Sequence, residues 1–270
     1  MKIISISSGK GGVGKTTLAC HLALALSAHN KRVLIVDGDL GLANVDIHFG
    51  VRPRNHLGDI LEGKSVKECI TPVLKNIDLM AGASGISELT ALNSFQRREL
   101  IKQVQDLQFS YDYAIIDTAS GIHEHVLHLN AVADDCVVVL SQDPTSFADA
   151  YALIKVLHQK YKMQNFKVAC NQIRNQSGEQ LFIKFSEVVE KFLPVGLSFL
   201  GSIPYDEMVQ IIQQQQRLIM RQSLNTQAGE VIKSIAIDLI TDSQSDAYAE
   251  HVGQKTSGFE AIFRPATGHA

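Results

Sequence analysis

Short apolar stretches rich in Val and Ile recur along the chain, separated by longer segments whose apolar residues follow helical spacing. The short stretches predict buried strands at 2–7, 32–37, 77–81, 113–117, 135–140, 166–171 and 197–203. The longer segments predict helices at 15–29, 94–107, 121–132, 145–160, 179–192 and 224–240. This alternation is typical of the α/β class, with a mostly parallel, doubly wound central sheet and helices on both faces. In such folds, ligands bind beyond the carboxyl ends of the strands.

The periodic pattern ends near residue 241. We therefore expect one domain over residues 1–241, followed by a flexible C-terminal tail over 242–270, where Ser, Asp, Gly and Thr replace the apolar pattern. The tail contains one apolar turn, formed by Phe259, Ile262 and Phe263. Pro265 would end a helix there almost at once, so a disordered tail is favoured over a partner-binding peptide or a weak membrane anchor.

The overall composition limits the classes of partner. The net charge is −3 in 270 residues, which favours neither nucleic acid nor an anionic membrane as the main partner. The four cysteines are far apart, and no Cys or His spacing indicates zinc or an iron–sulfur cluster. There is no basic leader and no apolar run approaching about 18 residues. We therefore expect a cytoplasmic protein, with peripheral contact at the inner face of the cell membrane as the alternative.

The strongest chemical signal lies between the first expected strand and the first expected helix. Residues 9–16, Gly-Lys-Gly-Gly-Val-Gly-Lys-Thr, match the P-loop pattern G-x-x-x-x-G-K-S/T. The glycines allow backbone N–H groups to converge on phosphates, Lys15 would face the β- and γ-phosphates, and Thr16 would give its hydroxyl to Mg²⁺. The loop residues expected to bind ATP or ADP are Gly11, Gly12, Val13, Gly14, Lys15, Thr16 and Thr17. A glycine-rich turn without a ligand is disfavoured by the flanking strand and helix.

Two further expected strands end in carboxylates. Asp37 and Asp39 are two residues apart, so one pleat direction sends both side chains the same way, towards the expected phosphates. Asp117 ends the strand at 113–117, where a carboxylate can hold Mg²⁺ through water. A helix-capping role is the alternative for Asp117.

A second lysine, Lys10, lies inside the loop, where phosphate binding requires no further charge. With this lysine, the loop and the two acidic strand ends resemble the MinD/ParA class of ATPases, which carry a deviant Walker A motif, over about residues 1–240. In that class the lysine reaches across a dimer interface to the partner's nucleotide. The resemblance implies a homodimer that forms with Mg²⁺-ATP and an ATPase that is slow and stimulated by a partner.

The resemblance also implies roles for particular residues. The position of Asp39 orients or activates the attacking water, so the expected catalytic residues are Lys10, Lys15 and Asp39. The position of Asp37 helps to organise the metal shell, so the expected metal site comprises Thr16, Asp37 and Asp117. The adenine-contacting positions correspond to Asn171, Pro204 and Tyr205. A polar residue after a strand is also a common turn former, which is the alternative for Asn171.

Within this class, the segments 39–47 and 117–122 look most like the flagellar-number regulators FlhG/FleN, also called YlxH, and they also resemble MinD. This likeness implies regulation of flagellar number or placement. The protein partner would be a flagellar GTPase, a transcription regulator or a component of the flagellar basal body. Flagellar regulators usually carry an extension before the first strand that stimulates a GTPase. Here that strand begins at Lys2, so the resemblance leaves GTPase stimulation open.

Other functions share such an ATP site. A MinD-like regulator of the cell-division site needs membrane recruitment, for which the short tail offers little. A ParA-like DNA partition ATPase needs a basic surface, and DNA binding is not expected at this net charge, although a local cluster could form from Arg52, Arg54, Lys64 and Lys67. An electron-transfer or cluster-scaffold ATPase needs ligating cysteines that the sequence lacks. No pocket for a small phosphate acceptor can be read from the sequence.

Overall fold

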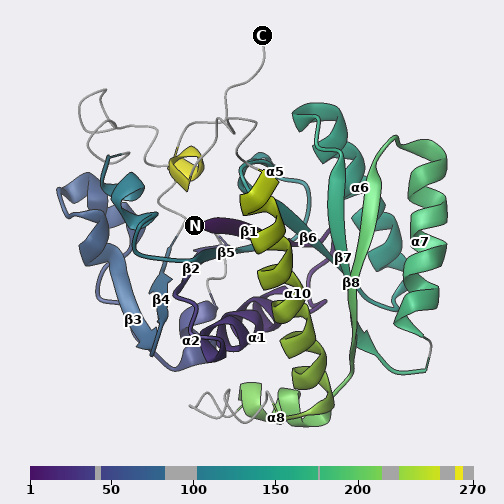
Figure 1. Ribbon diagram of the computed structural model, residues 1–270, viewed down its shortest axis with the longest axis horizontal. Helices are drawn as coiled ribbons and strands as arrows, with labels where there is room; N and C mark the ends of the chain where they lie inside the picture. Colours follow the sequence, from purple (N-terminus) through teal and green to yellow (C-terminus); the bar gives the residue numbers. More distant parts are fainter. Residues whose placement is uncertain (40–43, 83–101, 176, 215–224, 250–258, 264–270) are drawn as a thin grey trace.

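The computed structural model describes residues 1–39, 44–82, 102–175, 177–214, 225–249 and 259–263. Its strands form one sheet in the order β3-β4-β2-β5-β1-β6-β7-β8 (Figure 1). The strands are β1 (Lys2–Ser7), β2 (Val33–Gly38), β3 (Ile70–Leu74), β4 (Ile77–Met80), β5 (Tyr113–Thr118), β6 (Asp135–Leu140), β7 (Asn165–Ile173) and β8 (Gly196–Pro204). Every neighbouring pair is parallel except β3 and β4. The predicted α/β class and mostly parallel sheet are therefore confirmed.

Helices cover both faces of the sheet (Figure 1). The α-helices are α1 (Lys15–Ala28), α2 (Val45–Phe49), α5 (Glu124–Ala131), α6 (Pro144–Tyr161), α7 (Gly178–Phe192), α8 (Glu207–Gln214) and α10 (Gln227–Ala249). Short 3₁₀ helices occupy η1 (Leu57–Glu62), η2 (Val66–Cys69) and η5 (Phe259–Phe263). Alternation along each strand divides the core, so Ile4 packs with α1 and α10 whereas Ile3 packs on the opposite face.

Most predicted elements match the observed ones within a few residues. The expected helix at 94–107 is helical over residues 102–107, and its first part lies outside the described residues. The sequence prediction missed β3, α2 and α8. The first two are each five residues long, too short for a clear period to emerge.

Two described segments of the predicted flexible tail are helical. The helix expected to end at residue 240 continues to Ala249. Within the predicted flexible tail, η5 places Phe259 and Ile262 in the core, 1% and 0% exposed, beside Leu34 and Ile116. The carbonyl of Ala261 lies 3.1 Å from Nε2 of His128. The apolar turn read from the sequence is therefore packed against the sheet, because its spacing presents both large side chains to one surface.

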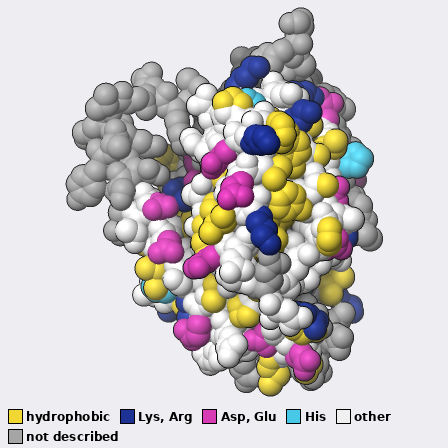
Figure 2. Space-filling model, turned by 90° about the vertical axis from the view of Figure 1, so that its right-hand side faces the viewer, with side chains coloured by type: hydrophobic (Ala, Val, Ile, Leu, Met, Phe, Trp, Pro, Cys, Tyr) yellow, Lys and Arg dark blue, Asp and Glu magenta, His cyan; other side chains and the backbone are white. Residues whose placement is uncertain are grey.

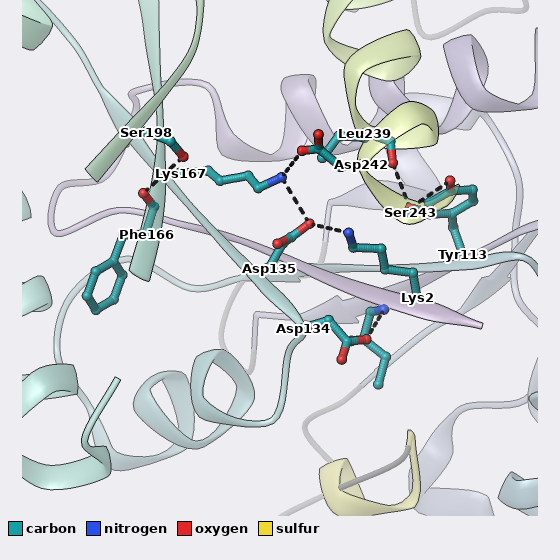
Figure 3. A network of polar contacts seen from close by, with 11 residues as sticks. Lys2, Tyr113, Asp134, Asp135, Phe166, Lys167, Ser198, Leu239, Asp242 and Ser243 are labelled. Carbon is teal, nitrogen blue, oxygen red and sulfur yellow. Dashed lines mark hydrogen bonds and ion pairs between the residues drawn. The ribbon is translucent and has the colours of Figure 1, made fainter. Parts of the chain in front are cut away.

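A network of charged side chains secures α10 at the amino ends of the strands (Figure 3). Asp135, at the start of β6, lies 3.1 Å from Nζ of Lys2 and 3.4 Å from Nζ of Lys167. Lys167 also lies 2.7 Å from Asp242 of α10. The side chains of Lys2, Asp135 and Lys167 are at most 17% exposed, so the two ion pairs of Asp135 are shielded from water, whereas the Asp242 side chain is 54% exposed. The network therefore holds the later part of α10 at the amino ends of the strands, away from the carboxyl ends where ligands bind.

The flank of the molecule at the β8 edge of the sheet, which includes α7, exposes hydrophobic side chains. Those of α7 are Ile183, Val188 and Phe192. Figure 2 views this side and shows hydrophobic side chains gathered along it, with charged side chains between and around them. Within the described part of the chain, no helix has the length and apolar character needed to cross a bilayer.

Candidate functional site

The loop between β1 and α1 lies at the carboxyl end of the sheet, and glycines set its shape. Gly12 and Gly14 have φ values of 78° and 90°, the left-handed region that disfavours other residues. A Cβ at Gly14 would collide with the amide of Asn171, and one at Gly9 would collide with the backbone of Asp149 in α6. The glycines therefore allow a tight turn and close packing against β7 and α6.

Lys15 is the first residue of α1, and its side chain is buried beneath the loop. Its Nζ donates to Oγ of Ser8 at 3.0 Å. Burial lowers the pKa of Lys15, while the charges of Asp117 and Asp39 act in the opposite direction. The predicted phosphate lysine thus faces the predicted acidic residues across the loop.

Asp117 has the features of a cation ligand. It is 2% exposed at the end of β5, and its Oδ1 is buried with no hydrogen-bond partner among the described residues. Burial raises its pKa to about 7, although a hydrogen bond from Thr16 opposes the shift. A buried carboxylate oxygen without a partner is costly unless a cation or donor completes it. The predicted pair of Asp117 and Thr16 therefore fits Mg²⁺.

Asp37 lies beside Asp117, because β2 and β5 pair these two residues in register. Its carboxylate accepts backbone N–H groups of Asp39, Asn44 and Val45, at 3.1–3.2 Å. Burial raises the pKa of Asp37 to about 6. Asp37 thus holds Asp39 and the first residues of α2 as well as lying beside Asp117.

The acidic groups do not form a complete metal site by themselves. Among the described residues, no three His, Cys, Asp or Glu side chains are grouped to hold a metal. Mg²⁺ is commonly bound by one or two carboxylates together with phosphate oxygens and water. The geometry of Asp117, Thr16 and Asp37 thus suits a metal that arrives with a nucleotide.

Lys10 lies in a different environment from Lys15. Its ammonium contacts the carboxylate of Asp143 and lies 2.6 Å from Oγ1 of Thr145. Asp143 is the N-cap of α6 and accepts the backbone N–H of Thr145 at 2.8 Å. The hydrogen bond from Lys10 is the main cause that lowers the pKa of Asp143 to about 2. The Asp-Pro pair signals a helix start, but nothing local signals the contact with Lys10.

A cavity lies next to the loop, between the start of α1 and the ends of β7 and β8. Its volume is about 500 Å³, including its open mouth. It brings together the predicted residues Thr17, Asn171, Pro204 and Tyr205. Asn171 also donates from Nδ2 to the carbonyl of Val13 at 2.8 Å, so its amide holds the loop in place. The sequence prediction missed the apolar wall formed by Val209, Ala228 and Ile232. Their signal was an ordinary apolar helix face, which does not distinguish a pocket from the core.

Comparisons with known proteins agree with this geometry. The family described as an AAA domain matches residues 1–170. The antiactivator FleN of Pseudomonas aeruginosa is 36% identical over 238 residues, covering 87% of this chain and 85% of FleN. The septum site-determining protein MinD of Bacillus subtilis is 32% identical over 214 residues, covering 76% and 77%. This chain is a MinD/ParA-type ATPase of the FleN/FlhG group.

Other relatives of this MinD/ParA-type ATPase extend the comparison. The flagellum site-determining protein YlxH of Helicobacter pylori is 27% identical over 248 residues, covering 91% of this chain and 84% of YlxH. The solved MinD structure from Aquifex aeolicus superposes with a TM-score of 0.70 at 22% identity, covering 89% of this chain and 97% of that one. MinD from Pyrococcus horikoshii, solved with Mg-ADP, gives a TM-score of 0.68 at 22% identity, covering 88% and 95%. At these identities, the two structures support the fold alone.

Proposed function

We propose that this protein is a Mg²⁺-ATP-dependent dimerising switch that regulates the number or placement of flagella. Hydrolysis of ATP to ADP and phosphate returns the switch to the monomer. The flagellar assignment is supported by the relatives named antiactivator FleN and flagellum site-determining protein YlxH. Hydrolysis is slow and stimulated by a protein partner. Slow hydrolysis suits a switch whose dimer must persist until a partner acts, rather than a metabolic enzyme.

The observation that carries the proposal is the separation of the two loop lysines. Lys15 is buried beside Asp117, where it can neutralise phosphate charge within its own chain. The Lys10 side chain is 35% exposed and is held at the surface by Asp143. A cation at the rim of the site can serve the nucleotide of a second copy that docks face to face. ATP binding and self-association then become linked equilibria.

The remaining site residues divide the chemistry. The backbone N–H groups of residues 11–16 and the Lys15 ammonium bind the phosphates, and Asn171, Pro204 and Tyr205 contact the base. Thr16 and Asp117 hold Mg²⁺, with Asp37 in its outer shell. When bound, Mg²⁺ neutralises charge that develops between the β- and γ-phosphates. Asp39 orients the attacking water, and Lys10 of the partner copy stabilises the transferred phosphate.

We further propose that the switch acts in the cytoplasm on a flagellar GTPase, a transcription regulator or a basal-body component. Weak membrane contact through the C-terminal segment requires Phe259 and Ile262 to leave the core, because both are buried in the described conformation. Membrane contact is therefore a secondary part of the proposal. The division-site alternative is supported by the MinD relative of Bacillus subtilis.

The proposal is tested by calorimetry with Mg²⁺-ATP and by light scattering coupled to size exclusion. Lys15→Ala should lose most ATP affinity, because it removes the buried phosphate counter-charge. Lys10→Ala should bind ATP as a monomer but lose ATP-dependent dimerisation. Lys191→Ala, at an exposed position on α7, serves as the matched control. A wild-type protein that stays monomeric in Mg²⁺-ATP contradicts the switch, and wild-type ATP affinity in Lys15→Ala contradicts the site.

A further inference from the structure

The end of β7 and the residue after it separate two cavities of the site. The base pocket, lined by Tyr205, lies on one side. The other cavity is lined by Lys10, Asp143 and Arg174 together with the loop. Gln172 lines both cavities. This short segment therefore connects the base end of the site to the surface that holds Lys10.

Arg174 contacts both sides of this division. Its guanidinium carbon lies 3.3 Å from the centre of the Tyr205 ring, so the group stacks on the ring face. Its backbone N–H donates to Oε1 of Gln142 at 3.0 Å. Gln142 directly precedes Asp143, the residue that holds Lys10. Arg174 thus contacts the wall of the base pocket and the segment that carries the counter-ion of Lys10.

The backbone around Arg174 is held by several independent contacts. Gln172 has a φ of 59°, which is uncommon for a residue other than glycine. Its Nε2 donates to the carbonyl of Gly12 at 3.2 Å, and the N–H of Tyr205 donates to the carbonyl of Ile173 at 2.8 Å. A sparsely populated conformation persists where surrounding contacts determine it, and such positions cluster at functional sites. The guanidinium is therefore presented from a fixed backbone.

We infer that Arg174 is a positioning residue of the base pocket. Its guanidinium holds the Tyr205 ring as the wall beside which a purine base lies, and its backbone ties that wall to Gln142 and Asp143. The inference rests on the proposed function, because it assigns this pocket to the base of ATP. It adds a residue that the phosphate-loop motif does not include.

The inference separates base binding from phosphate binding. Lys15 is held by Ser8, and the loop is held by Asn171 and Gln172. Removing the Arg174 side chain leaves these contacts in place while freeing one face of the Tyr205 ring. A guanidinium stacked at an exposed site contributes roughly 2- to 5-fold in affinity. The loss should therefore appear with a ligand that carries a base and not with a bare polyphosphate.

The experiment measures calorimetric affinity for Mg²⁺-ATP and for Mg²⁺-tripolyphosphate. Arg174→Ala should weaken ATP binding about 2- to 5-fold and leave tripolyphosphate binding unchanged. Arg174→Lys should recover part of the ATP affinity, because an ammonium also attracts the ring face but stacks less well. Adding Arg174→Ala to Tyr205→Ala should cause no further loss. Arg54→Ala, at another exposed arginine, is the control and should match the wild type.

Unchanged ATP affinity in Arg174→Ala would overturn the inference, and so would an equal loss with both ligands, which indicates a general disturbance of the loop. Thermal unfolding of each variant checks that the fold is intact. Failure of the proposed function gives a different result, since the wild-type protein itself would then not bind Mg²⁺-ATP.

Discussion

At the scale of single residues, position in the fold gives identical side chains different burial, different partners and different pKa values. Lys10 and Lys15 lie in the same loop, but the ammonium of Lys15 is buried and its pKa is lowered. Lys10 instead sits at the surface in an ion pair with Asp143. Asp117 shows the same dependence on environment, because burial raises its pKa to about 7. A carboxylate held in this way costs stability until a cation joins it.

Replacing Asp117 should therefore stabilise the protein in the absence of Mg²⁺ and nucleotide. The pKa of Asp117 is raised on folding, so its destabilising effect begins as pH rises above about 4 and is complete above about 7. Asp117→Asn is neutral throughout, and its free energy of unfolding at pH 8 should exceed that of the wild type by at least about 1 kcal/mol. The difference should shrink towards pH 5. Urea unfolding at both pH values measures it.

Two controls accompany this measurement. Asp238→Asn, at an exposed position of α10, should change stability little at either pH. Mg²⁺-ATP should stabilise the wild type but not Asp117→Asn, because the variant lacks the metal ligand. If Asp117→Asn were less stable than the wild type at pH 8, the charge of Asp117 would not destabilise the fold, and its assignment as a buried carboxylate that needs a bound cation would be wrong.

At the scale of elements, α10 and η5 join distant parts of the molecule. The first turns of α10 place Ala228 and Ile232 in the proposed base pocket. Its later part carries Asp242 to the charged network at the opposite end of the strands (Figure 3). Beyond α10, η5 packs on the other face of the sheet, among Leu34 and Ile116. Among the described residues of the C-terminal region, α10 and η5 are thus part of the folded domain.

Docking of η5 predicts a cost for removing its large side chain. Phe259→Ala should lower the free energy of unfolding by about 1–3 kcal/mol, because it removes a buried ring, and local undocking limits the loss. Phe109→Ala, at a ring that is 84% exposed, should change it by less than about 0.5 kcal/mol. Urea unfolding compares the two variants. Equal stability of both would mean that η5 does not contribute to the fold in solution.

At the scale of the whole molecule, the proposed switch requires a second copy of the chain to complete the site. In the proposed dimer, the exposed Lys10 of each chain would serve the nucleotide of the other chain. Asp39 follows β2 directly, and its charge acts on Lys15. In the proposed cycle, the dimer forms with ATP and dissociates after hydrolysis. Asp39 is the residue proposed to orient the attacking water in the hydrolysis step.

Asp39→Ala should bind Mg²⁺-ATP and dimerise but fail to return to the monomer, because water activation is lost after the dimer has formed. Light scattering followed over time should show the wild-type dimer decaying as ATP is consumed while the variant dimer persists. Phosphate release, measured in parallel, should fall at least about 100-fold. Asp238→Ala should behave like the wild type. A variant that remains monomeric in ATP while the wild type dimerises would contradict this role.

Local sequence pattern was enough to predict several features of the fold and the site. Gly9 to Thr16 specify a phosphate loop because the glycines dictate its backbone. Short apolar stretches rich in Val and Ile predicted the buried strands, and apolar residues at helical spacing predicted the helices. The carboxyl ends of parallel strands share one edge, so Asp37 and Asp117 could be placed together before the sheet was seen. Local pattern therefore predicted the sheet, most of the helices and the centre of the site.

Contacts between residues far apart in the sequence could not be predicted from local pattern. Lys10 and Asp143 are 133 residues apart. Ile232, in the last long helix of the sequence, lines the proposed base pocket together with Thr17 near the start of the sequence. Phe259 and Ile262 looked like part of a tail because their own segment is short and lies among polar residues. Each of these contacts depends on strand order and on the path of a helix across the sheet. Such long-range geometry follows from the packing of the whole chain, which no single segment encodes.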